Sequence, residues 1–355
     1  MSVLEDPSIF KLLGLVFLMF SFSGCSSIYY LYQAGRGQLK LLNRGKAIED
    51  VVQDPRTEPE LIELLKKIPE IKAYGEKSGL KATSNYREYV KLDDDAVVYV
   101  VTVSDTLAFK PKIFSFPIVG SFNYIGWFGR EDAKKFASTF EKDGYDVDVR
   151  GAGAYSTLGW FRDPLLSSMI PKDQGKIVPE AFPELVNVFL HESVHATVYI
   201  SNQSYFNEGL AMFVAGVLTD RFFRDHGLLQ SDAYLRYQKY EARSEMIRKK
   251  FTQAYQDLKN IYDSAQTPEQ KLKAKNEYLS KLQTDLGFRR KITNATLIQF
   301  QTYHSSEPEF RALFQQAKED VQVLFKVLST LSEKDFEHPQ SEDLKSLMIK
   351  LKSRI

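Results

Sequence analysis

The sequence predicts an α+β fold, in which a small mixed α/β layer packs on a mainly helical domain. Runs rich in β-branched and aromatic residues, which are typical of strands, are confined to residues 89–155. Helical periodicity and helix-capping sequences dominate from Pro179 to the C-terminus. The composition, 43% hydrophobic and 26% charged over 355 residues, is that of a folded globular protein.

The N-terminus predicts a signal peptide over residues 1–24 and a lipid anchor at Cys25. A short apolar run, Leu12–Phe20, follows Lys11 and precedes small residues, as in secretory signals. This run is too short to cross a bilayer, which takes about 20 apolar residues. Residues 22–25 resemble a bacterial lipobox, and Cys25 is the only cysteine of the chain. An unmodified cysteine in an ordinary secreted precursor is the alternative.

These features predict a lipid-anchored protein in the bacterial cell envelope that faces the periplasm. Ser26, rather than an aspartate, follows Cys25. In the enterobacterial sorting pattern this residue indicates the outer membrane. Stable attachment would need several acyl chains, because a single chain binds a membrane only marginally.

The mature chain is expected to divide into a mixed α/β region over residues 25–165 and a helical region over residues 166–355. Residues 26–79 read as helical, with a capping box at residues 57–60 that begins one of the helices. Three further elements of the first region follow from composition and periodicity. They are a buried strand over residues 96–103, a helix over residues 130–143 and a strand over residues 146–149.

A helical hairpin is predicted toward the C-terminus. Residues 234–263 form a long, charged helical pattern, and a capping box at residues 267–270 begins a second helix. Another capping sequence, at residues 306–309, indicates a third helix. We interpret the charged residues of the hairpin as solvated faces of a helical bundle.

The charge balance argues against nucleic acid as a partner. Lys and Arg number 47 against 46 Asp and Glu, which gives a formal net charge of +1. Nucleic-acid-binding domains carry a basic excess on some stretch of the chain. The basic stretches here, such as residues 248–250, are short and have acidic residues close by.

The chemistry of the protein is indicated by the sequence HESVH at residues 191–195. On a helix, His191 and His195 lie one turn apart on the same face, so that both imidazoles can reach one ion. Glu192 is offset by about 100° and can contact a water molecule at the metal without binding the metal itself. The apolar residues on both sides of the motif indicate a buried helix, in which such polar groups need a function.

Glu208 is the predicted third ligand of a single zinc ion. It lies 13 positions after His195, near the start of a second apolar helix. A short turn near Asn202 allows the two helices to pack together and direct Glu208 toward the histidines. Two histidines and one glutamate form an established ligand set for catalytic zinc, which keeps a fourth position for water.

The motif HESVH followed by FNEGLA resembles the gluzincin pattern of metallopeptidases. More closely, the chain resembles a bacterial family of predicted zinc aminopeptidases. The shared stretches include residues 120–121, 144–147, 150–151 and 154–164 as well as the zinc motif. The resemblance covers most of the mature chain and implies a zinc-dependent aminopeptidase with a zincin-like helical domain. Met212 occupies the position where thermolysin-like enzymes have an acidic residue, so the residues that orient the histidines are not identified from the sequence.

In this interpretation the substrate is a peptide and Glu192 is the general base and acid. Zinc would activate the attacking water, and Glu192 would take its proton and pass it to the leaving amine. A further donor should stabilise the oxyanion. The candidates that the sequence offers are Tyr155, Tyr205, Tyr303 and His304. The segment of residues 150–161 could equally be the strand that holds the substrate backbone or an ordinary core strand and turn.

Two other functions stay open at this stage. The chain could be a non-catalytic envelope lipoprotein that uses its helices as a docking surface. It could also be a zinc endopeptidase that acts on envelope proteins, since the segment of residues 150–161 has no glutamate that could bind the substrate's free amine. Metal content and the effect of Glu192→Gln separate the first alternative from a peptidase, and amine-blocked peptides separate the second from an aminopeptidase.

Overall fold

The structure, a computed structural model, describes residues 25–116, 120–157 and 161–354, with side chains from residue 29 onward. It contains two compact units, residues 1–44 and residues 45–355. In the first unit, the described element is helix α2, Cys25–Leu42. The predicted signal peptide, residues 1–24, and the side chain of Cys25 lie outside the described residues. Among the helices that the structure describes, none is both long and apolar enough to cross a membrane.

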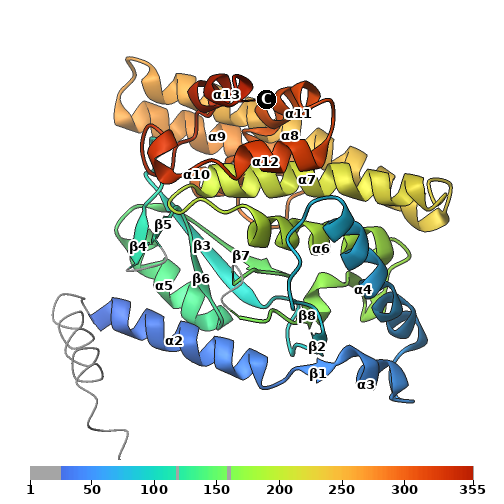
Figure 1. The fold of residues 1–355 in the computed structure, drawn as a ribbon. Helices are drawn as coiled ribbons and strands as arrows, with labels where there is room; N and C mark the ends of the chain where they lie inside the picture. The colour runs from blue at the N-terminus through green and yellow to red at the C-terminus, as the bar shows by residue number, and fades with distance from the viewer. Residues whose placement is uncertain (1–24, 117–119, 158–160, 355) are drawn as a thin grey trace, which may run out of the picture. The chain divides into compact units, whose positions relative to one another are not determined.

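The second unit is built around a three-stranded antiparallel sheet in the order β6-β3-β7 (Figure 1). The central strand β3, Val98–Ser104, is buried along its whole length. Strand β6 covers Ile125–Trp127, and the edge strand β7 covers Asp146–Ala152. The strands predicted at residues 96–103 and 146–149 are thus present, each displaced or extended by two to three residues.

Helices cover both faces of this sheet. Helix α5, Arg130–Lys142, packs on the face that carries Trp127. The ring centroids of Trp127 and of Phe136 in this helix are 5.0 Å apart. Helix α10, Asn294–His304, packs on the opposite face. On that side, Thr102 of β3 donates a hydrogen bond of 2.6 Å to Gln299. Side chains alternate between the faces of a strand, so the sheet has a helix layer on each side.

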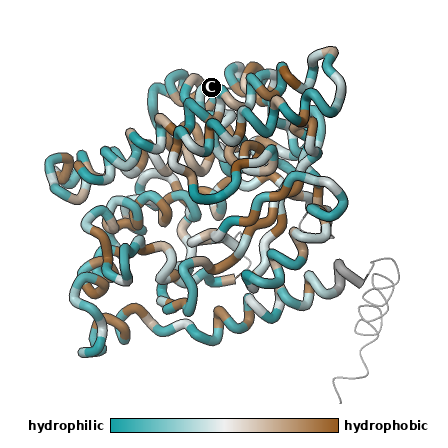
Figure 2. Tube along the Cα trace, turned by 180° about the vertical axis from the view of Figure 1, so that it is seen from behind, coloured by the Kyte–Doolittle hydropathy of each residue, from teal (hydrophilic) through white to brown (hydrophobic). Residues whose placement is uncertain are grey.

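The predicted helical hairpin is present as α8, Asp232–Asp263, and α9, Pro268–Leu286. Thr267 forms the expected capping box at the start of α9. The two helices pack on an apolar cluster that includes Phe251, Leu258 and Leu282. Figure 2 shows the alternation of apolar and hydrophilic residues along the helices of this unit.

One charge of the hairpin is buried, against the expectation of solvated faces. Lys275 has 3% of its side-chain surface exposed and forms a 2.5 Å ion pair with Asp146 at the start of β7. Its ammonium group also donates a hydrogen bond of 2.9 Å to the carbonyl oxygen of Thr106. The pair fixes α9 to the sheet.

The remaining elements are short or peripheral to the sheet. Helices α3 and α4 cover Ile48–Gln53 and Pro59–Lys77. Small sheets join β1, β2 and β8, then β4 and β5, then β9 and β10. The bounds of these strands are Lys46–Ala47, Glu88–Val90, Leu165–Leu166, Phe114–Phe116, Gly120–Phe122, Lys172–Asp173 and Lys176–Ile177. Helices α11, α12 and α13 cover Glu307–Gln316, Val321–Leu328 and Lys345–Lys352, and single 3-10 turns cover Ser167–Met169 and Glu333–Asp335.

Two of the predicted capping interactions are wrong, although the helices they introduce exist. Thr57 donates its hydroxyl to the carbonyl oxygen of Val51 at 2.7 Å, so it does not cap α4. Ser306 precedes α11 without a side-chain hydrogen bond to the helix.

Taken together, the helices and small sheets form the predicted α+β fold. The predicted division at residue 165 stays a prediction; strand β8, which begins there, pairs with β2 of the earlier region.

Candidate metal centre

The HESVH sequence lies in the last two turns of helix α6, Ala181–Thr197. Apolar residues of this helix are fully buried, among them Leu185, Val186 and Leu190. The chain becomes extended at Val198, where the helix ends. The motif therefore has the helical context that its spacing requires, in the protein interior.

Helix α7, Ser204–Asp225, follows after a six-residue connection and packs against α6. Asn207 in its first turn holds this connection in place. Its side-chain oxygen accepts a hydrogen bond of 2.9 Å from the Ile200 amide, and its side-chain nitrogen donates one of 2.7 Å to the Ile200 carbonyl. The clamp folds the connection back onto the first turn of α7, where Glu208 is located.

Asn202, at the tip of the connection, ties it to strand β5. It has a left-handed backbone conformation, with φ of +62°. Its side-chain oxygen accepts hydrogen bonds from the amide and the hydroxyl group of Ser121, at 2.6 and 2.8 Å. Gly120, at φ of +87°, allows this approach, because a Cβ atom there would lie 2.8 Å from the same oxygen.

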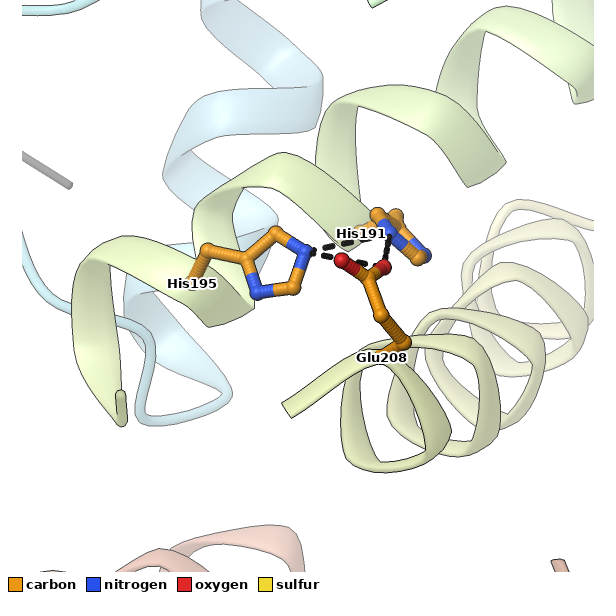
Figure 3. A group of neighbouring side chains, drawn as sticks. All are labelled: His191, His195 and Glu208. Carbon is orange, nitrogen blue, oxygen red and sulfur yellow. Dashed lines mark hydrogen bonds and ion pairs between the residues drawn. The ribbon is translucent and has the colours of Figure 1, made fainter. Parts of the chain in front are cut away.

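Figure 3 shows that His191, His195 and Glu208 point toward one another from α6 and α7. The Nε2 atoms of the two histidines are 3.2 Å apart. Each lies 3.5 Å from Oε2 of Glu208. Of the residues that the structure describes, these three form the one group of at least three ligand-type side chains close enough to bind a single metal ion. The sequence predicted the same three.

The electrostatics of the group also fit a cation. Burial alone would raise the pKa of Glu208, but His195 and His191 outweigh burial and hold this pKa well below its usual value. Burial alone would lower the pKa of His195, but Glu208 reverses this effect and raises it. A bound metal ion would take the place of the proton that Glu208 favours on His195, because metal ligands must be deprotonated.

Glu192 is buried next to the three ligand-type side chains but does not join them. It is 7% exposed, and its Oε2 atom is buried without a hydrogen-bond partner among the described residues. Burial raises its pKa; Glu208 and Asp163 add to this effect, and the two histidines oppose it. A buried carboxylate oxygen without a partner is costly, so its position next to a ligand group points to a polar occupant. Both the donor set and this unpartnered oxygen therefore fit a metal ion with a water molecule.

Tyr124, which the sequence analysis did not identify, orients the glutamate of the group. Its hydroxyl group donates a hydrogen bond of 2.9 Å to Oε1 of Glu208 and leaves Oε2 for the histidines. Burial and the Glu208 carboxylate both raise the pKa of Tyr124 well above its usual value, so the hydroxyl group stays a donor. Hydrogen bonds of this kind fix the direction of metal-binding carboxylates. No local sequence pattern reports it, because 84 residues separate the two side chains.

Of the four candidates for oxyanion stabilisation, Tyr303 is the one that contacts a predicted ligand. Its ring stacks on His191, with ring centroids 6.4 Å apart and an angle of 20°. Its oxygen accepts a hydrogen bond of 3.0 Å from Arg150 Nη2. Tyr205 instead directs its hydroxyl to Glu342 at 2.8 Å. Tyr155 packs on Phe128 and His304 on Phe300, with the pKa of His304 lowered to about 4 by burial.

The sequence matches the family described as "Putative aminopeptidase" over residues 29–342. The chain belongs to this family. The match spans both the sheet and the helices of the candidate metal centre, and membership supports a peptidase activity in general terms. No curated protein and no solved structure matches the chain.

Proposed function

We propose that the protein is a zinc-dependent aminopeptidase, anchored in the bacterial envelope by a lipid at Cys25 and facing the periplasm. The observation that carries the proposal is the group of His191, His195 and Glu208, with its nitrogen and carboxylate donors within 4.8 Å of one another. Membership in the aminopeptidase family supports the same function. The zinc ion, the substrate class and the membrane anchor are parts of this proposal.

Two histidines and a glutamate would hold the zinc ion, with Tyr124 fixing the carboxylate of Glu208. When bound, zinc supplies Lewis-acid chemistry, which polarises the scissile carbonyl group and acidifies water. The ligand set has no cysteine, which is typical of catalytic rather than structural zinc sites.

Glu192 would move the proton. Its unpartnered Oε2 would accept a proton from the attacking water and pass it to the leaving amine nitrogen as the peptide bond breaks. The raised pKa of Glu192, caused first by burial, brings the carboxylate closer to the proton affinity that a base acting near neutral pH needs. The glutamate returns to its starting state, so the net reaction consumes one water molecule.

Tyr303 is the donor that we assign to the oxyanion. Since Arg150 donates to the Tyr303 oxygen, the hydroxyl hydrogen of Tyr303 is not used in that bond. Burial and the Glu208 carboxylate raise the pKa of Tyr303, while Arg150 opposes this effect, so the hydroxyl stays protonated. A preorganised donor stabilises the charge that develops in the transition state.

The edge strand β7 would carry the substrate backbone. Arg150 of this strand joins it to Tyr303 and, through the ring stack, to His191. Strand β7 pairs with β3 along one edge, and its other edge pairs with no strand of the three-stranded sheet. The carbonyl oxygens of Val147 and Val149 already accept hydrogen bonds from Thr293 and Arg290, so an extended peptide would add to the part of this edge beyond Val149.

Metal content and hydrolysis test the proposal on a chain that begins at Ser26. This chain keeps every described element and lacks only Cys25, the first residue of α2. The parent should bind about one zinc ion, and His195→Ala and Glu208→Ala should lose it. Glu192→Gln should keep the zinc and lower kcat at least about 100-fold. Glu184→Gln on the same helix is the matched control and should keep both properties.

Peptide substrates then separate the possible functions. An aminopeptidase should cleave peptides with a free amine and ignore the same peptides with the amine blocked. Cleavage of the blocked peptides would instead favour an endopeptidase of envelope proteins. A well-folded parent that binds no zinc when zinc is supplied would contradict the proposal and leave the envelope scaffold.

A further inference from the structure

Helix α2 carries an unusual concentration of exposed apolar side chains. Of the twelve large apolar residues that are exposed in the described part of the chain, four lie in this one helix. Tyr32, Leu39 and Leu31 are 61%, 60% and 50% exposed. Scattered apolar residues are ordinary on protein surfaces, but a cluster of them marks an interaction site.

The same face of α2 is basic. Arg36 and Lys40 lie four and eight positions after Tyr32, and Leu39 lies seven positions after it, so these four residues form one stripe on a helix. The sequence contains no acidic residue from Cys25 to Ile48, whereas it contains four cationic residues there. Figure 2 shows the resulting alternation of apolar and hydrophilic residues along the helix that continues from the grey trace.

We infer that this face of α2 binds an anionic lipid surface. A helix with exposed aromatic and aliphatic side chains beside Arg and Lys, and without acidic residues, lies in the plane of a membrane interface. There the apolar side chains enter the boundary between head groups and acyl chains, while the cations contact the lipid phosphates. An acidic protein partner would match the charges, but it would not need the exposed leucines and tyrosine next to them.

Position along the chain supports a lipid surface in particular. The stripe begins seven residues after Cys25, about two helical turns, so a membrane anchor at Cys25 would bring α2 to the lipid. The anchor at Cys25 and the apolar and basic stripe would then contact the same lipid surface. The inference does not need a lipid modification at Cys25, because the stripe consists of side chains that the unlipidated protein also carries.

Vesicle binding of the chain that begins at Ser26 tests the inference. Vesicles of phosphatidylcholine with phosphatidylglycerol should bind the protein, and vesicles of phosphatidylcholine alone should bind it much less. Binding should weaken as salt is added, because salt screens charges at the surface. Each cation near an anionic membrane contributes about a fivefold change in binding, so Arg36→Gln with Lys40→Gln should weaken it about 25-fold.

The control is Lys66→Gln with Lys67→Gln on α4. These two lysines are exposed as well, with 54% and 47% of their side-chain surface accessible. Their replacement removes the same number of charges. The control should bind the anionic vesicles as the parent does. Leu39→Ser with Tyr32→Ser should weaken binding without changing its salt dependence, which separates the apolar from the electrostatic contribution.

Three results would overturn the inference. They are a parent that does not bind anionic vesicles, α2 variants that bind as the parent does, and a control that loses as much binding as they do. Metal content and peptide hydrolysis should be unchanged in the α2 variants. Because vesicle binding requires neither zinc nor substrate, the result is independent of the proposed peptidase function.

Discussion

The hydroxyl group of Tyr124 donates a hydrogen bond to Oε1 of Glu208, while Oε2 of the same carboxylate lies 3.5 Å from both His191 and His195. The two oxygens thus have separate partners. One is held by a group from the loop after β5, and the other is directed to the histidines of α6. This arrangement makes Tyr124 a positioning residue for the candidate metal centre.

We expect Tyr124→Phe to weaken zinc binding by about 10- to 100-fold, as loss of a partner that orients a metal ligand does. The free carboxylate oxygen would let the Glu208 side chain rotate away from the ligand position. Competition with a chelator of known affinity measures the effect. Tyr234→Phe is the matched control, because Tyr234 donates a similar hydrogen bond, of 2.6 Å, to Asp220. Equal zinc affinity in the two variants would remove Tyr124 from the site.

Tyr303→Phe should lower kcat about 100-fold while the protein keeps its zinc and its KM, because the donor acts on charge that develops in the transition state. Phenylalanine keeps the ring that stacks on His191, so the metal centre should stay intact. Steady-state kinetics with metal content on the same samples checks both points. Tyr205→Phe, which removes a hydroxyl bound to Glu342, is the control. An unchanged kcat in Tyr303→Phe would leave the oxyanion without this donor.

Most of the candidate site could be predicted because its information is local. The spacing of His191 and His195 needs only a helix, and Glu208 follows in the first turn of the next helix after a short connection. The partners of these residues come from distant parts of the chain. Tyr124 donates to Glu208 from a loop 84 residues earlier in the chain, and Asn202 ties the helix connection to Ser121 close to that loop; no residue pattern near either position reveals these contacts.

Helix α10 does not stand out in the sequence, because its buried residues are a mixture of apolar and polar side chains. Asn294, Thr296, Gln299 and Thr302 are buried together with its apolar residues, so the helix lacks the clear apolar periodicity that indicates a helix in a sequence. The burial of these residues is stabilised by hydrogen bonds to other elements, such as the one from Thr296 to Asp148 at 3.0 Å. Tyr303 comes from this helix, so its selection among the four candidates required the fold.

Asn202 offers a test of how the helix connection is held. Asn202→Ala should destabilise the protein by about 2–4 kcal/mol, because it removes two hydrogen bonds to Ser121 and one to Glu333 and places alanine at a left-handed φ. Asn202→Gly removes the same hydrogen bonds without the steric cost. Chemical denaturation should therefore rank the parent above the glycine variant and the glycine variant above the alanine variant by about 1 kcal/mol. The reverse order of the two variants would contradict a role for the backbone conformation.

The stability of the protein should depend on pH through Glu184 on α6. Burial, together with the charges of Glu241 and Glu180, raises the pKa of Glu184 to about 7, from an ordinary value of 4.5. Between these two pH values the folded state holds a proton that the unfolded state has lost. Folding stability from this group is therefore complete below about pH 4.5 and decreases as the pH rises toward 7.

Glu184→Gln removes this dependence, because the amide stays neutral at every pH. The variant should gain up to about 3 kcal/mol over the parent at pH 8, since one pKa unit corresponds to about 1.4 kcal/mol, and should gain little at pH 4.5. Thermal unfolding of both proteins across this range, in the same metal-free buffer, measures the difference. Glu63→Gln, an exposed glutamate on α4, serves as the control and should shift Tm little at any pH. A gain from Glu184→Gln that is the same at pH 4.5 and pH 8 would show that the effect comes from packing rather than from the charge.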